Sequence, residues 1–146
     1  MLKASGVRIG LIKHTHHDVD IDQPGKDSYR LRKAGATPVV LISAHRRSVI
    51  TEFETPEEPL LANQLSVFSK TDTDLIIVEG FKHERFPKIE LHRKELARPF
   101  LYPNDPSIIA IASNQAYHCH LPVLDINDPD NVTNFIINSF LKKHYE

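Results

Sequence analysis

The sequence predicts an α/β fold in which a mostly parallel β-sheet is flanked by helices, with one β-hairpin around residues 38–51. Two runs, residues 75–78 and 108–112, are apolar without polar alternation, which is typical of parallel strands covered on both faces. Segments with helix caps and apolar residues at helical spacing stand between the strands. Because strand and helix alternate, the two kinds of element are expected to pack as layers around one core.

The composition is that of one ordinary globular domain spanning residues 1–146. Hydrophobic residues make up 40% and charged residues 25%, which excludes a largely disordered chain. The net charge of −1 indicates no basic face for nucleic acid, and no apolar run is long enough to span a bilayer. Cys119 is the single cysteine and cannot form an internal disulfide. We therefore expect a cytoplasmic protein without nucleic-acid or membrane partners.

The other strands are predicted from short runs of branched residues bounded by turn residues. They are residues 7–12, 38–43, 47–51, 88–92 and 121–124, of which the second and third form the hairpin. Three helices are predicted from their end signals. They are a helix from an Asp27 or Ser28 cap through Ala34 to Gly35, one from a Thr55 cap to about Lys70, and one starting at Asp128–Pro129. Residues 1–5 resemble the last turn of a helix closed by Gly6, so we expect a further segment upstream of Met1.

A polar loop rich in histidine and aspartate, residues 13–28, follows the first predicted strand. Its aspartates stand at every second position from Asp18 to Asp22, as at the start of an EF-hand. However, Gln23 replaces the glycine and Tyr29 the closing glutamate that this calcium loop needs. The sequence therefore excludes an EF-hand.

Two groups of histidines are candidate metal ligands. His14, His16 and His17 offer zinc or nickel ligands in the polar loop, although no fourth ligand stands at an established spacing, and a solvated loop is the alternative. The second group is His118-Cys119-His120. In an extended segment the two histidines would point to one face and the cysteine to the other. This favours exposed histidines around a structural cysteine.

Ligands of parallel α/β sheets bind beyond the carboxyl ends of the strands. The loops after Ile12, Val78 and Ala112 are therefore the candidate functional loops. The second begins with Glu79 and Gly80, and a strand-end acid of this kind holds Mg²⁺ directly or through water in phosphate-binding proteins. A purely structural acid is the alternative.

Four stretches together resemble the molybdopterin-guanine dinucleotide biosynthesis protein B (MobB) family. They are GLIKHTHHD at residues 10–18, DxxGKDSxxLRxAGA at residues 22–36, LIIVEGFKH at residues 75–83 and LDIND at residues 124–128. The resemblance implies a P-loop NTPase-like fold that binds GTP with Mg²⁺, hydrolyses it slowly and forms a homodimer. It also implies an accessory role beside the guanylyltransferase that attaches GMP to molybdopterin, with other molybdenum cofactor biosynthesis proteins as partners.

The resemblance also implies roles for particular residues by position. The nucleotide and magnesium contacts would be Asp18, Asp27, Ser28, Glu79 and Gly80, with Glu79 holding Mg²⁺ indirectly. Candidate phosphate or loop contacts are Lys13, His14, His16 and His17, and candidate base contacts are Ser113 and Asn114. No catalytic residue is assigned.

The sequence departs from the family in one respect: its 146 residues contain no G-x-x-x-x-G-K-S/T phosphate loop. Near Gly25-Lys26, Asp20 stands where the first glycine belongs and Asp27 where the hydroxyl belongs. The family's loop lies between a first strand and a first helix, which would both precede residue 1. Since such a loop supplies several charge-assisted hydrogen bonds of about 1.5–3 kcal/mol each, we expect weak GTP binding and at most a weak GTPase. A catalytically silent dimeric adaptor and a histidine-loop metal-handling protein are the alternatives.

Overall fold

The computed structural model describes residues 1–68 and 73–141. The chain forms two compact units, one of residues 1–12 with 68–146 and the other of residues 13–67. The predicted helix end at Lys70 lies outside the described residues. Among the described helices, none has the length and apolar character needed to cross a membrane.

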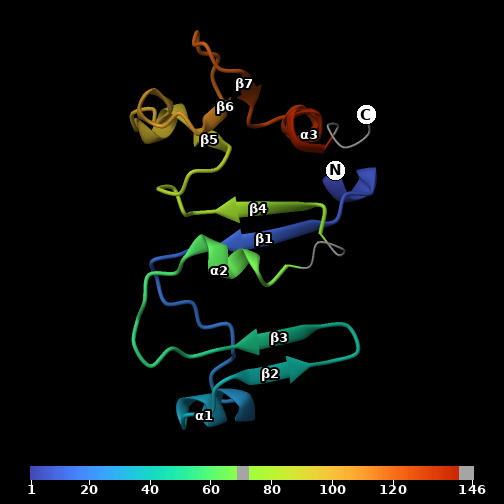
Figure 1. The fold of residues 1–146 in the computed structure, drawn as a ribbon, viewed down its shortest axis with the longest axis vertical. Coiled ribbons are helices and arrows are strands. Elements are labelled where there is room, and N and C mark those ends of the chain that lie inside the picture. Colours follow the sequence, from blue (N-terminus) through green and yellow to red (C-terminus); the bar gives the residue numbers. More distant parts are fainter. Residues whose placement is uncertain (69–72, 142–146) are drawn as a thin grey trace. The chain divides into compact units, whose positions relative to one another are not determined.

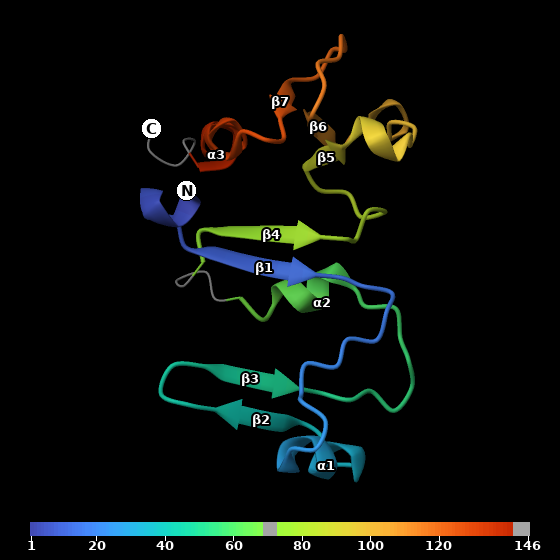
Figure 2. The same cartoon turned by 180° about the vertical axis from the view of Figure 1, so that it is seen from behind.

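The unit of residues 13–67 is built around a β-hairpin. Its elements are α1 (Asp27–Lys33), β2 (Val39–Ile42), β3 (Arg47–Ile50) and α2 (Leu61–Leu65). The two strands run antiparallel, with Val39 opposite Ile50 and Ile42 opposite Arg47 (Figure 2). The predicted hairpin is therefore confirmed. Residues 14–26 form the predicted loop without helix or strand, whereas Lys13, predicted as its first residue, still belongs to a strand.

The predicted helix from Thr55 is wrong, because helix begins only at Leu61. Pro59 explains the difference. A proline inside a helix lacks an N–H donor, and its ring clashes with the carbonyl four residues earlier, which here belongs to Thr55. Glu58, the residue before this proline, is also disfavoured in the helical conformation.

The predicted cap of α1 at Asp27 or Ser28 is also wrong, because both residues already lie inside the helix, which begins at Asp27. Lys26 occupies the N-cap position and provides no side-chain cap. The Ser28 hydroxyl instead donates a hydrogen bond to Asp22 Oδ1 at 2.9 Å. The other end agrees with the prediction, because Gly35 follows the helix with φ of 106°, a conformation that favours glycine.

The other unit contains two parallel sheets. One pairs β1 (Ile9–Lys13) with β4 (Leu75–Glu79), and both arrows point the same way in Figure 1. The second joins β5 (Lys88–His92), β6 (Ile108–Ser113) and β7 (Val123–Asp125) in that order, all parallel. Short 3₁₀ turns occupy Leu2–Ser5, Lys94–Leu96 and Tyr102–Asn104. Gly6 has φ of 80° and closes the first of them, as predicted.

The core of this unit lies between β6, β7 and α3 (Pro129–Ile136). Ala110, Ala112 and Leu124 are buried, and Val132 and Phe135 of α3 pack against them. The helix starts as predicted, because Asp128 accepts hydrogen bonds from the next two available backbone N–H groups. A π-helical segment, Ile137–Leu141, continues the chain.

The two apolar strand predictions differ in outcome. In β6 every residue except Ile109 is buried, which confirms a strand covered on both faces. In β4 all five residues are partly or largely exposed, so the same expectation is wrong there. Pairing with β1 covers only one edge of β4, and both alternating sets of its side chains remain partly open to solvent.

Arg8 and Asp74 tie the beginnings of β1 and β4 together. Arg8 donates from its backbone N and from Nε to Asp74 Oδ2 and from Nη2 to Oδ1, at 2.7–3.0 Å. The Arg8 side-chain hydrogen bonds, followed by its backbone N–H, lower the pKa of Asp74 from 3.8 to about 2. The carboxylate therefore favours the folded chain once it is ionised.

Acid should weaken this link in a defined pH range. Because the pKa of Asp74 is lower in the folded chain, its ionised carboxylate stabilises the fold fully above the unfolded pKa of 3.8. This stabilisation is lost as the pH falls toward about 2. We expect Asp74→Asn to lower the thermal midpoint at pH 6. Between about pH 4 and 2, the midpoint of this variant should fall less than the midpoint of the parent chain. The difference between the two melting curves isolates Asp74 from other acids. Parallel losses in both chains over this range would contradict the assignment.

Candidate functional site

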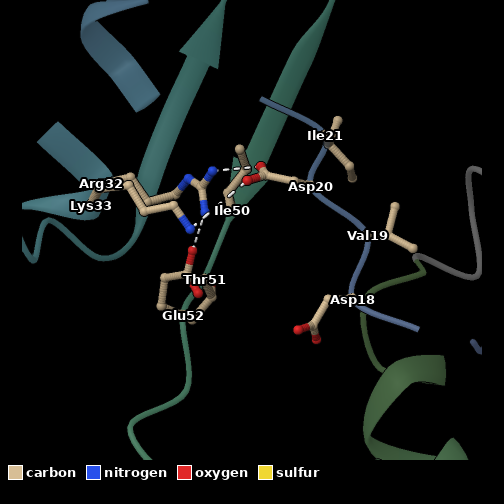
Figure 3. A pocket seen from close by; sticks show the side chains of 9 residues that line it. All are labelled: Asp18, Val19, Asp20, Ile21, Arg32, Lys33, Ile50, Thr51 and Glu52. Atoms are coloured by element: carbon tan, nitrogen blue, oxygen red, sulfur yellow. Dashed lines mark hydrogen bonds and ion pairs between the residues drawn. The ribbon is translucent and has the colours of Figure 1, made fainter. Parts of the chain in front are cut away.

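The buried side chain of Arg32 organises the histidine- and aspartate-rich loop. It lies on α1, is 5% exposed, and donates from Nη2 to Asp20 Oδ1 at 2.5 Å and from Nη1 to Glu52 Oε1 (Figure 3). Its Nε lies 3.8 Å from Asp22 Oδ2. The guanidinium therefore connects the loop, the helix and the segment after β3 within one unit.

The hydrogen bonds around Arg32 favour the charged forms of Arg32 and Asp20. The hydrogen bond from Arg32 lowers the pKa of Asp20, and the hydrogen bonds to Asp20 and Glu52 raise the pKa of Arg32. Asp22 is buried and accepts the Ser28 hydroxyl at Oδ1. Asp20 and Asp22, which the sequence places in an EF-hand-like spacing, thus face a guanidinium and a hydroxyl in the fold.

A pocket of about 260 Å³ opens beside Arg32. Its lining comes from the loop, α1 and the end of β3, namely Asp18, Val19, Asp20, Ile21, Arg32, Lys33, Ile50, Thr51 and Glu52 (Figure 3). Lys33 Nζ lies 3.9 Å from Asp20 Oδ2. Asp18 lines the same pocket as Arg32 and Lys33, whereas Asp27 and Ser28 are not among its lining residues.

The loop histidines separate into two groups. The His14 and His16 rings lie 4.8 Å apart between centroids, edge to face. His14 Nε2 is also 3.7 Å from Glu58 Oε1. His17 is exposed, and its backbone N–H donates to the Thr15 hydroxyl. Lys13 is the last residue of β1 and is exposed.

In the other unit, Glu79 ends β4 and is followed by an unusual turn. Gly80 and Phe81 have φ of 93° and 48°, so two successive residues adopt the left-handed region. Glycine does so freely, but for phenylalanine this conformation costs of order 1 kcal/mol. Such strain persists where surrounding contacts enforce it, and it often marks functional loops. The turn bends the chain away directly after the exposed Glu79 carboxylate.

A second pocket, of about 350 Å³, lies at the carboxyl ends of β6 and β7. This volume falls in the usual range for ligand pockets, about 300–1,000 Å³. Its lining residues are Ser113, Asn114, Gln115, Ala116, Tyr117, Val123, Leu124, Asp125 and Asn127. The structure thus places both Ser113 and Asn114 in the lining of a pocket, at the edge of the sheet where the topology predicts a ligand.

Hydrogen bonds fix the polar groups of this pocket. Asn114 Nδ2 donates to both carboxylate oxygens of Glu95 at 2.8 and 2.9 Å, while its Oδ1 accepts the Lys94 N–H. The backbone N–H of Glu95 itself and then Asn114 lower the pKa of Glu95. Ser113 is buried, and Asp125 Oδ1 accepts the Asn127 N–H at 2.8 Å. The Asn114 amide therefore serves mainly to hold the pocket wall.

Sequence reasoning assigned no role to several residues of these sites. Arg32, Glu52 and Glu58 join the loop from distant positions, and no spacing pattern links them to it. Asp125 and Asn127 stand in the LDIND stretch, but only the fold places them beside Ser113. The 118–120 segment agrees with its prediction, since both histidines are exposed and Cys119 between them is half-buried.

Comparison with known proteins identifies the family. The sequence profile of "Molybdopterin guanine dinucleotide synthesis protein B", MobB, matches residues 1–114. The chain belongs to the MobB family. It is 46% identical over 147 residues to the molybdopterin-guanine dinucleotide biosynthesis adapter protein of Escherichia coli K12, covering 98% of this chain and 82% of the relative. The adapter protein of Haemophilus influenzae is 40% identical over 137 residues, covering 94% and 75%.

Solved MobB structures have the same fold. A crystal structure of molybdopterin-guanine biosynthesis protein B matches with a TM-score of 0.70 at 19% identity, covering 94% of this chain and 84% of that one. Bacillus subtilis MobB matches with a TM-score of 0.65 at 26% identity, covering 92% and 82%. The predicted P-loop NTPase-like α/β fold and the resemblance to the MobB family are therefore confirmed.

Proposed function

We propose that this chain is an accessory protein of molybdenum cofactor biosynthesis that assists the conversion of molybdopterin to its guanine dinucleotide form. The observation that carries the proposal is 46% identity, over nearly the whole chain, to a protein named as an adapter of this biosynthesis. An adapter binds and positions other molecules. The two pockets fit this role, because each gathers polar side chains around a concave surface.

We further propose that the chain contacts GTP and Mg²⁺. On the phosphate side the contacts would be Asp18, Asp27, Ser28, Glu79 and Gly80, with Glu79 reaching Mg²⁺ through water and Lys13, His14, His16 and His17 as further phosphate or loop contacts. On the base side, Ser113 and Asn114 would wall the pocket at the ends of β6 and β7. Asp125 would accept N–H groups of guanine, whose edge carries donors.

The affinity of the chain for GTP should be low. The 146 residues contain no phosphate loop, and each charge-assisted hydrogen bond lost is worth about 1.5–3 kcal/mol. Because 1.4 kcal/mol corresponds to a tenfold change, loss of several such bonds weakens binding by powers of ten. Any GTP hydrolysis by the chain would be slow for the same reason.

We also propose that the protein works as a cytoplasmic homodimer that binds the guanylyltransferase. Exposed apolar side chains on the β2–β3 hairpin support self-association, since contiguous apolar surface marks protein interfaces. Ile42 is 77% exposed and Val49 52% exposed.

A reconstituted reaction tests the proposed function. Guanylyltransferase, molybdopterin, GTP and Mg²⁺ are incubated with and without this chain, and the guanine dinucleotide product is measured. We expect the chain to increase product formation. In a separate calorimetric titration of the purified chain with GTP, the dissociation constant should lie well above the micromolar range.

The Asp125→Ala variant separates the nucleotide proposal from the adapter proposal. If the chain contacts guanine through Asp125, this variant should lose most of the stimulation, whereas Asp130→Ala on the exposed surface of α3 should retain it. Unchanged stimulation by Asp125→Ala would contradict the base contact and support a silent adapter. No stimulation by the parent chain would overturn the accessory role, and micromolar GTP affinity would overturn the weak nucleotide site.

A further inference from the structure

Three potential metal ligands meet in the unit of residues 13–67. His14 and His16 lie two residues apart directly after β1, and Glu58 comes from the segment before α2. One ligand atom from each side chain lies within 4.8 Å of the other two. The His14 side chain is 12% exposed, whereas Glu58 is 77% exposed, so one ligand is anchored inside the fold and one can adjust from solvent.

The donor set indicates which ions the cluster would select. Two imidazoles and one carboxylate suit zinc and neighbouring transition metals, whereas Mg²⁺ and Ca²⁺ prefer sites made of oxygen ligands. Three protein ligands with one open position are typical of zinc sites that bind water or substrate. The cluster therefore differs chemically from the magnesium contact proposed at Glu79.

The geometry is close to that of a bound state. With metal–ligand bonds of about 2.1 Å and tetrahedral angles, ligand atoms lie about 3.4 Å apart. The ligand atoms all lie within 4.8 Å of one another, and His14 Nε2 is 3.7 Å from Glu58 Oε1, so none of the separations exceeds the bound value by more than about 1.4 Å. An ion pair between His14 and Glu58 alone would not account for the edge-to-face position of His16 against His14.

We propose that His14, His16 and Glu58 form a binding site for one divalent transition-metal ion of the zinc class, with the fourth position open to water or a ligand. This site gives the chain a metal-handling capacity of its own. It does not depend on GTP binding or on the accessory role, because its ligands all belong to one compact unit and require no nucleotide.

Metal titration of the full chain tests this site. After treatment with a chelator and its removal, the chain is titrated with Zn²⁺ against a chromophoric indicator, and with Co²⁺ while its visible absorption is recorded. We expect one ion per chain, a Co²⁺ spectrum of four-coordinate type, and no displacement of Zn²⁺ by excess Mg²⁺. His14→Ala, His16→Ala and Glu58→Gln should each weaken Zn²⁺ binding by about tenfold or more.

Two neighbouring substitutions serve as matched controls. His17→Ala removes a histidine of the same loop, and Glu57→Ala removes an exposed glutamate next to Glu58; both should retain parental Zn²⁺ affinity. Circular dichroism without metal should show the same fold for all five variants, because each altered side chain lies outside the helices and strands. Three results would overturn the site. They are no Zn²⁺ binding by the parent chain, Zn²⁺ binding that survives all three ligand substitutions, and Zn²⁺ binding that is lost instead when His118 and His120 are replaced.

Discussion

Replacing Arg32 by methionine should lower the thermal midpoint of the chain by roughly 10 °C, because it removes a buried cation that three carboxylates share, one of which, Asp22, is also buried. Methionine fills much of the same volume, so the loss would come from charge and hydrogen bonds and not from an empty space. Asp22, itself 6% exposed, would be left buried beside an apolar side chain. Asp20 and Glu52 would lose their shared donor.

The measurement is a thermal melt combined with limited proteolysis, in which new cleavage should fall within residues 13–67. Arg30→Met is the matched control, since Arg30 lies exposed on the same helix and should change the midpoint little. Arg32→Lys should fall in between, because an ammonium keeps the charge but not the planar fork that reaches three carboxylates. Equal midpoints for Arg32→Met and Arg30→Met would refute this role of the network.

The same substitution has a consequence for the proposed nucleotide contacts. Arg32 holds Asp20 and thereby shapes the pocket that Asp18 lines. An Arg32→Met chain that is still folded at low temperature should therefore lose part of its stimulation of guanine dinucleotide synthesis, as well as stability.

Replacing Ile111 by alanine should destabilise the other unit by about 2–5 kcal/mol, the usual range for truncating a buried isoleucine. Ile111 is 0% exposed in β6, the central strand of the three-stranded sheet. Its removal leaves a cavity that close-packed neighbours fill only in part. Urea unfolding followed by circular dichroism measures the change.

Leu91→Ala is the control for this experiment. Leu91 lies on the neighbouring strand β5 but is 72% exposed, so its truncation should change the free energy of unfolding by no more than about 0.5 kcal/mol. Because Ser113 follows Ile111 by two residues, the Ile111 variant should also disturb the pocket at the end of β6. A loss below about 1 kcal/mol would contradict the assignment of Ile111 to a rigid core.

Local patterns predicted those elements whose stability is decided by nearby residues. The hairpin follows from two runs of branched residues bounded by turn residues, β6 from an apolar run, and the start of α3 from the Asp128 cap. The helix expected from Thr55 failed for an equally local reason, since Pro59 blocks helix and was outweighed in the prediction by the cap and the apolar face.

Local patterns predicted only part of the candidate sites. Their loop positions follow from the rule that ligands bind beyond strand ends, and the pocket with Ser113 and Asn114 lies there. Arg32 bonds to Asp20 and Glu52, which lie 12 and 20 residues away in the sequence. Glu58 reaches His14 from another segment of the same unit. No periodicity encodes such contacts, because they depend on where the folded chain turns back.

The sequence by itself determined the family, the α/β class and the polar loop of residues 13–28 as the leading candidate for function. Its motif is long, and loop composition is visible without a structure. Only the tertiary structure decided that Asp20 and Asp22 serve Arg32, and that His14 and His16 meet Glu58 while His17 does not. The physical reason is that ion pairing and metal coordination require atoms within a few ångströms. Such distances are set by packing and not by separation along the chain.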